Sequence, residues 1–243
     1  MKPLLRWLGL VAIAFVALQL FFVARITLML VVHPQSTAFQ RSAAWQLARA
    51  QGALHWHQQW VPYAQISNNL KRAVIASEDD NFVNNDGVEW EAIEKAWQKN
   101  AKAEARAAQR ARLDRPFAKP PKIVGASTIT QQLAKNLFLS GERTLLRKGQ
   151  ELALTMLLEN ILGKRRILEI YLNSVEWGTG VFGAEAASER YYHKPASRLS
   201  AYEAARLAVM LPRPTYFERV PNSGYLASRA STIVARMGDA ELP

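Results

Sequence analysis

Hydrophobic residues fill one long stretch near the amino terminus. From Leu8 to Ala24 the chain has no charged residue, and beyond Arg25 the apolar run resumes through Val32. About 20 apolar residues suffice for a helix to cross a bilayer, and Arg25 can extend to the interface. A cleaved signal peptide is the alternative, but the run is longer than its usual apolar core and no clear cleavage site follows. The pattern favours a retained transmembrane helix.

Positive charge precedes this stretch, at Lys2, Arg6 and the amino group of the chain. Such charge usually stays on the cytoplasmic side, so we expect a cytoplasmic amino terminus and an exported domain. Three regions follow: residues 1–33 form the anchor, 34–65 a membrane-proximal connector and 66–243 one folded domain. A domain of that length can bury a substantial core.

The folded domain shows mainly helical periodicity, and the alternation typical of strands is scarce. A mainly α fold is therefore predicted. Helix start signals stand at Ser67, at Thr128 with Gln131, and at Ser200 with Glu203, the last two with capping-box spacing.

Charge narrows the choice of partners. The chain has 31 Lys and Arg against 20 Asp and Glu, for a net charge of +11, and no cysteine. Anionic partners are expected, and disulfides and thiolate metal sites are excluded. Between residues 95 and 122 nine Lys or Arg face two acids. This basic insert is either a solvated helical arm or a membrane-surface contact.

Three consecutive acids, Glu78, Asp79 and Asp80, stand where the helix that begins after Ser67 is expected to end. The helix dipole disfavours negative charge at that end. Such conflicts often mark functional sites, although a solvated acidic cluster is the simpler explanation.

The helix expected after Thr128 has two faces. Ile129, Leu133 and Leu137 share the apolar face at intervals of four residues. The polar side carries Gln131, Gln132, Lys135 and Asn136. Amides suit sugar hydroxyls and a lysine suits a phosphate, although an ordinary amphipathic helix has the same pattern.

A third segment places Arg147 and Lys148 four and three residues before Glu151, on one helix face. An exposed helical ion pair is worth only about 0.3 to 0.5 kcal/mol, and the order here is the less favourable one. A carboxylate among these cations and Arg143 suits a site that handles pyrophosphate. Nothing in the sequence resembles a His or Cys metal cage.

These segments resemble the motifs of the peptidoglycan glycosyltransferases of family 51, in their single-domain, monofunctional form. The first motif is matched by Glu78, Asp79, Phe82 and Gly87, the second by GASTITQQLAKN, and the third by Arg147, Lys148 and Glu151. The later runs ILEIYLN, EWGTGVFG, ERYYHK and LSAYEAARLAVMLPRP also fit, so the resemblance covers roughly residues 66 to 216. The S-x-x-K and K-T-G motifs of penicillin-binding domains are absent from the sequence.

The resemblance implies a lysozyme-like domain that transfers a growing undecaprenyl-pyrophosphate-linked glycan onto lipid II. Glu78 would act as the general base on the acceptor 4-hydroxyl, and the reaction would invert to give β-1,4 linkages. Glu151, Lys135 and Arg143 would stabilise the pyrophosphate, with Mg²⁺ or Mn²⁺ as the expected cofactor. The expected location is the inner membrane, with the catalytic domain in the periplasm. Penicillin-binding and division proteins are the expected protein partners.

The resemblance also assigns the substrate contacts. The residues expected to bind substrate are Asp79, Phe82, Ser127, Thr128, Gln131, Gln132, Lys135, Asn136, Arg143, Arg147 and Lys148.

Two features depart from the family pattern. Asn85 stands where a histidine is usual, which puts any titrating role there in doubt. The basic insert lengthens the stretch between the two glutamates to 73 residues.

Three other functions stay open on the sequence. A muramidase or lytic transglycosylase would cleave glycan with Glu78 as an acid, but it would need no cationic pyrophosphate site. A non-catalytic membrane-anchored scaffold would not need both glutamates. Nucleic-acid binding, suggested by charge alone, does not fit an exported domain.

Overall fold

The computed structural model describes residues 2–51, 56–112, 127–139, 142 and 144–243. The longer helices are α1 (Lys2–Leu28), α2 (Ala38–Gln51), α3 (Asn68–Glu78), α4 (Trp90–Arg112), α5 (Ile129–Phe138), α6 (Leu145–Leu162), α7 (Lys164–Ser174), α8 (Ala184–Tyr192), α9 (Ala201–Met210) and α11 (Gly224–Arg236). Shorter helical turns are η1 (Tyr63–Gln65), η2 (Ala196–Arg198) and α10 (Pro214–Phe217), and the strands are β1 (His57–Gln58), β2 (Glu176–Gly178) and β3 (Val181–Phe182).

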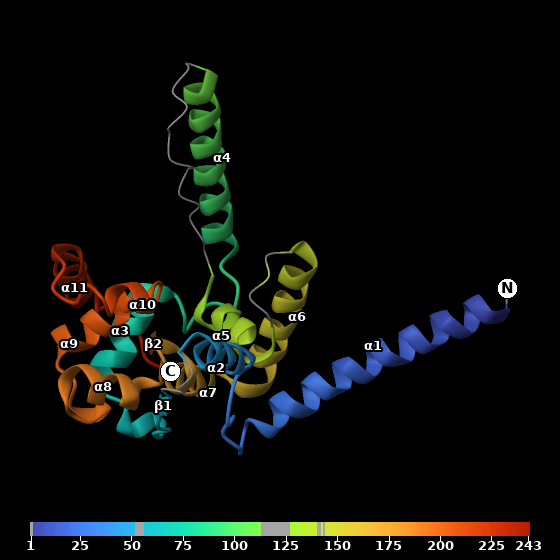
Figure 1. The fold of residues 1–243 in the computed structure, drawn as a ribbon, viewed down its shortest axis with the longest axis horizontal. Coiled ribbons are helices and arrows are strands. Elements are labelled where there is room, and N and C mark those ends of the chain that lie inside the picture. Colours follow the sequence, from blue (N-terminus) through green and yellow to red (C-terminus); the bar gives the residue numbers. More distant parts are fainter. Residues whose placement is uncertain (1, 52–55, 113–126, 140–141, 143) are drawn as a thin grey trace.

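The strands form one small sheet in the order β1-β3-β2. Strand β1 runs parallel to β3, whereas β2 and β3 form an antiparallel hairpin. All other elements of the described residues are helical, and the three strands are short (Figure 1). The mainly α fold predicted from periodicity is confirmed.

The predicted helix starts are also confirmed. The Ser67 hydroxyl accepts from the Leu70 backbone N–H, and α3 then ends at Glu78. Thr128 and Ser200 each begin a helix with a complete capping box. These bonds satisfy backbone donors that a helix start leaves unpaired.

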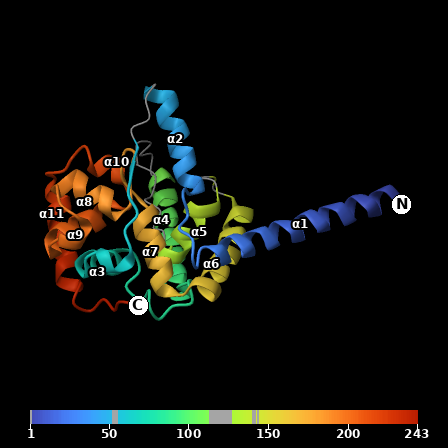
Figure 2. The same cartoon turned by 90° about the horizontal axis from the view of Figure 1, so that it is seen from below.

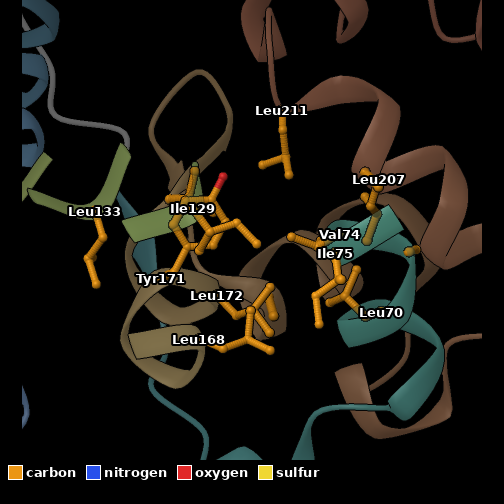
Figure 3. Close-up of a cluster of buried hydrophobic side chains, with 14 of the residues drawn as sticks. Leu70, Val74, Ile75, Ile129, Leu133, Leu168, Tyr171, Leu172, Leu207 and Leu211 are labelled. Carbon is orange, nitrogen blue, oxygen red and sulfur yellow. The ribbon is translucent and has the colours of Figure 1, made fainter. Parts of the chain in front are cut away.

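The core lies where α3, α5, α7 and α9 meet (Figure 3). Val74 of α3, Leu172 of α7 and Leu207 of α9 are buried in one cluster. Ile129 and Leu133 of α5 are fully buried, as their four-residue spacing predicts. Each such side chain contributes about 1.5 to 3 kcal/mol on burial. The same core holds the end of α3 and the start of α5 in place, and these two helix termini carry predicted site residues.

Helix α1 leaves the domain and extends away from it (Figures 1 and 2). Pro3–Leu28 is long and apolar enough to cross a membrane, and most of its side chains are exposed. Its last turns are different, because Phe22, Ile26 and the following Met29 are buried in the contact with the domain, where α1 packs on α6. Cleavage after the apolar run would remove these core residues, which favours the retained anchor.

The predicted connector packs closely against the domain. Helix α2 lies on α5, and β1 completes the sheet beside β3. In the segment of chain between β1 and α3, the Val61 backbone exchanges two hydrogen bonds with the side chain of Asn173 in α7.

The first part of the basic insert forms α4, which stands away from the rest of the domain (Figure 1). Trp90 and Trp97 are exposed on it. The helical character predicted there is confirmed up to Arg112, and residues 113–126 lie outside the described part. The choice between a solvated arm and a membrane contact stays a prediction.

Candidate active site

A cleft of about 570 Å³ opens between α2, α5 and α6. Most of the residues predicted to bind substrate line it, together with Glu151: they are Ser127, Gln131, Gln132, Lys135, Asn136, Arg147 and Lys148. A larger hollow of about 810 Å³, around Trp56 and His193, contains none of the predicted residues. The smaller cleft is therefore the candidate active site.

Glu151 lies at the cationic side of this cleft, on α6. It is nearly fully buried, and one of its oxygens accepts from Arg147 Nη1 at 2.7 Å while the other accepts from Lys148 Nζ. The helical face predicted from the sequence is confirmed. Glu151 therefore acts as the fixed partner that holds two cations in place.

Arg147 has one donor that the protein leaves unpaired. Its Nε is buried and makes no hydrogen bond within the described residues, which is costly. Lys148 is half-exposed toward solvent and both residues line the cleft, so the pair can accept an anionic ligand. Arg143, predicted to join them, lies outside the described residues.

Glu78 lies at the end of α3 and does not itself line the cleft. Its Oε2 accepts from Gln132 Nε2 at 3.0 Å, and the carbonyl oxygen of the same amide accepts from the Tyr171 hydroxyl at 2.9 Å. Because Tyr171 orients the amide, its NH₂ group points at the carboxylate. Gln132 lines the cleft, so it connects Glu78 to the site that contains Glu151.

Burial raises the pKa of Glu78, and hydrogen bonds from Gln132 and Ser77, with the charge of Arg229, oppose part of that rise. A carboxylate with a raised pKa is a better proton acceptor, which suits a general base. Burial and the negative charges of Glu78 and Asp79 raise the pKa of Tyr171, so its phenol stays protonated and donates.

Asp79 holds the protein together beside this carboxylate. It is buried; its Oδ1 accepts from Asn85 Nδ2 at 2.8 Å, and its Oδ2 accepts from the Ile129 backbone N–H at 3.0 Å. It thus ties the end of α3 to the start of α5. Burial raises the pKa of Asp79 to about 7.

Asn85 uses both ends of its amide. Its Nδ2 donates to Asp79, and its Oδ1 accepts from the Gly87 backbone N–H at 2.9 Å and from Lys164 Nζ at 3.1 Å. A neutral side chain that both donates and accepts fits these bonds. Asn85 therefore has a structural role here that involves no titration.

Two other predicted substrate contacts also face inward. Phe82 is fully buried, with the Lys164 ammonium 4.8 Å from its ring centroid. Thr128 accepts from the Gln131 backbone N–H and donates to the Gly87 carbonyl at 2.6 Å. Direct substrate binding by Asp79, Phe82 and Thr128 is not supported by these positions, because their polar atoms are used, or their surfaces covered, by the protein.

The expected divalent ion has no preformed cage in the described residues, where no group of three or more His, Asp or Glu side chains converges. Both oxygens of Glu151 already accept from cations. The residues present therefore do not fit a metal held by this carboxylate.

The sequence motifs missed one side of the cleft. Helix α2 contributes Ala38, Phe39, Ser42 and Gln46, and the end of α5 adds Phe138 and Leu139. No motif marks α2. Tyr171 was also missed as a site residue, although it stands in the ILEIYLN run that carried part of the resemblance.

Comparisons with known proteins identify the family of the chain. Residues 46–238 match the protein family described as Transglycosylase, whose domain is lysozyme-like. A biosynthetic peptidoglycan transglycosylase of Burkholderia thailandensis is 57% identical over 98% of this chain and 88% of its own length. Proteins of the same name from Burkholderia pseudomallei and Paraburkholderia xenovorans are 54% and 52% identical, over 98% of this chain and 88% and 94% of their own lengths. The chain therefore belongs to the transglycosylase family.

Proposed function

We propose that the protein polymerises the glycan strands of peptidoglycan. It transfers a growing chain, linked to undecaprenyl pyrophosphate, onto the 4-hydroxyl of lipid II. The observation that carries this proposal is the connection of a proton acceptor, Glu78, through Gln132 to a cleft with fixed cations. Family membership and the names of the relatives support the same reaction.

Glu78 acts as the general base in this reaction. It takes the proton of the acceptor 4-hydroxyl while that oxygen forms a bond to the anomeric carbon of the donor. The bond from that carbon to the pyrophosphate oxygen breaks on the opposite face, so an α-linked donor gives a β-1,4 product. Gln132 orients the carboxylate through the hydrogen bond to Oε2.

The leaving group departs with the electron pair of the broken bond. Lys135, Arg147 and Lys148 line the cleft and stabilise the charge that develops on the pyrophosphate. Glu151 keeps two of these cations positioned before the substrate arrives. Since pyrophosphate leaves readily, no strong general acid is required.

The cations distinguish this reaction from its alternatives. A muramidase or lytic transglycosylase does not release pyrophosphate, so the Arg147–Glu151–Lys148 group would have no use in it. A non-catalytic scaffold would not need an Arg147 donor that the protein leaves unpaired. It would also not need a Glu78 carboxylate that Gln132 holds in one orientation. Both alternatives are therefore disfavoured.

The apolar α1 supports placement of the enzyme in the inner membrane. The positive charge before it supports a cytoplasmic amino terminus and a periplasmic domain. Penicillin-binding and division proteins are the expected neighbours there.

The test is polymerisation of lipid II by the purified full-length protein in detergent. We expect wild type to yield long glycan on a gel and Glu78→Gln to lower the rate by about 10²- to 10⁴-fold, the usual contribution of a general base. Asp80→Asn is the matched control, because Asp80 is exposed and pairs with Arg236 outside the cleft. Unchanged polymerisation by Glu78→Gln, or digestion of preformed wall by wild type, would contradict the mechanism.

A further inference from the structure

Helix α2 forms a wall of the candidate active site although it carries none of the family motifs. Ala38, Phe39, Ser42 and Gln46 line the same cleft as the cations. Ala38, Ser42 and Gln46 follow one another at intervals of four, and Phe39 precedes Ser42 by three, which places all of them on one side of the helix. Ser42 and Gln46 are exposed, so their hydroxyl and amide are available to a ligand.

This wall is fixed in position. Thr37 and Gln40 exchange two hydrogen bonds at the start of α2, and Gln40 Nε2 also donates to the Ser174 carbonyl of α7 at 3.1 Å. Both side chains are fully buried, and α2 packs along α5. The cleft-facing residues are therefore preorganised, which lowers the entropic cost of binding.

The cleft lining combines polar and apolar side chains. Amides, hydroxyls and cations accompany three large apolar residues, Phe39, Phe138 and Leu139. Phe138 also contacts α1: the centroid of its ring lies 5.5 Å from that of Phe22, and the Arg25 guanidinium lies 5.3 Å from its centroid. This apolar residue of the cleft thus adjoins the apolar helix α1 where that helix meets the domain.

We propose that the cleft-facing side of α2 binds the lipid-linked pyrophosphate donor. Ser42 and Gln46 hydrogen-bond to its polar head group, and Phe39, with Phe138, packs against the isoprenoid units next to the pyrophosphate. A ligand with an anionic head and an apolar tail matches the combination of cations, polar groups and large apolar side chains in the cleft lining. This inference rests on the proposed function and extends it to residues outside the motifs.

The polar contacts are tested by binding, independently of turnover. In the full-length Glu78→Gln protein in nanodiscs, we measure the affinity for undecaprenyl pyrophosphate with Ser42→Glu added. A carboxylate in the cleft should repel the pyrophosphate and weaken binding by about 10-fold. The matched control is Ala48→Glu, which places the same group on an exposed position of α2 that does not line the cleft. It should bind within about 2-fold of the parent.

A second pair of variants tests the apolar contact. Phe39→Ser should weaken binding of undecaprenyl pyrophosphate several-fold but leave competition by inorganic pyrophosphate unchanged. Trp45→Ser is its control, because Trp45 is an exposed aromatic residue of α2 outside the cleft lining. Equal affinities of Ser42→Glu and Ala48→Glu, or of Phe39→Ser and Trp45→Ser, would overturn the role of α2.

Failure of the proposed polymerase function would give a different experimental result from failure of the inference about α2. In that case wild type would not polymerise lipid II even though the α2 variants differed in binding. If wild type polymerises lipid II and the paired variants bind alike, only the inference about α2 fails.

Discussion

The two acidic side chains at the end of α3, Glu78 and Asp79, make different kinds of contact. Glu78 faces Gln132 and, through it, the cleft, whereas its neighbour Asp79 makes all its bonds within the protein. Adjacent carboxylates thus have separate positions: Asp79 is structural, and Glu78 is the one available for the proposed chemistry. Their pKa values are both raised by burial, so a shifted pKa does not by itself identify the catalytic group.

The pKa of Asp79 predicts a pH dependence of stability. Because its folded pKa is about 7 against an ordinary 3.8, the folded protein holds the proton more tightly than the unfolded chain. The contribution of Asp79 to the free energy of unfolding therefore falls as pH rises from about 4 to about 7. We expect the advantage of wild type over Asp79→Asn to be largest near pH 4 and to shrink by about 2 to 4 kcal/mol near pH 8.

Thermal unfolding of both full-length proteins in detergent, across that pH range, measures this difference. Glu176, whose pKa is also raised to about 7, is present in both proteins and cancels in the comparison. A difference that does not change with pH would show that Asp79 is ionised throughout.

From the sequence, the candidate chemical groups could be predicted better than the contacts that their side chains make. Glu78 and Glu151 were singled out by helix positions that local electrostatics disfavours, and the structure places both beside residues of one cleft. The inward direction of Asp79 and Phe82 was not predictable, because it depends on Ile129 and Lys164, which are distant in sequence. Helical spacing predicts which residues lie on the same face of a helix. It does not predict which other element will pack against that face.

At the scale of elements, the turn between α3 and α4 connects the end of α3, which carries Glu78, to the start of α5. Gly87 has a φ of 81°, and its carbonyl accepts from Thr128 at the start of α5. A Cβ added there would lie 2.7 Å from Thr155 Cγ2 and 2.8 Å from Glu159 Cγ, both on α6. The turn therefore needs glycine for its backbone conformation and also for space.

A pair of glycine variants separates these two needs. Gly163, between α6 and α7, has a φ of 72° and no atom within 4 Å of an added Cβ. Gly163→Ala should cost about 1 to 3 kcal/mol from backbone strain alone, because its φ of 72° and ψ of 159° lie in a region that is essentially restricted to glycine. Gly87→Ala should cost about 1 to 3 kcal/mol more, because α6 must also shift. Chemical unfolding measures both, and equal costs would mean that the contact with α6 relaxes freely.

Capping motifs made the elements predictable, since Ser67, Thr128 and Ser200 each begin a helix through a local hydrogen bond. The position of α2 was not predictable in the same way. It depends on Gln40 reaching the Ser174 carbonyl, a contact across 134 residues of sequence. For that reason a segment expected to be a connector contributes a wall of the active site.

At the scale of the whole molecule, α1 is apolar enough to cross a membrane and is also part of the core. Ile26 is fully buried, whereas Ile13 in the same helix is 67% exposed. Ile26→Ala should therefore lower the free energy of unfolding of the domain by about 2 to 5 kcal/mol. Ile13→Ala, the matched control, should leave it nearly unchanged. Unfolding in detergent followed by tryptophan fluorescence measures both, and equal effects would mean that α1 does not stabilise the domain.

The packed junction between α1 and α6 also limits how the enzyme moves. A domain on a loose tether could tilt and sample many heights above the bilayer. Here the last turns of α1 are buried, so the domain has little freedom to tilt relative to α1. With α1 in the bilayer, as proposed, the candidate cleft stays near the lipid surface, and its encounter with a lipid-linked substrate becomes a search in two dimensions.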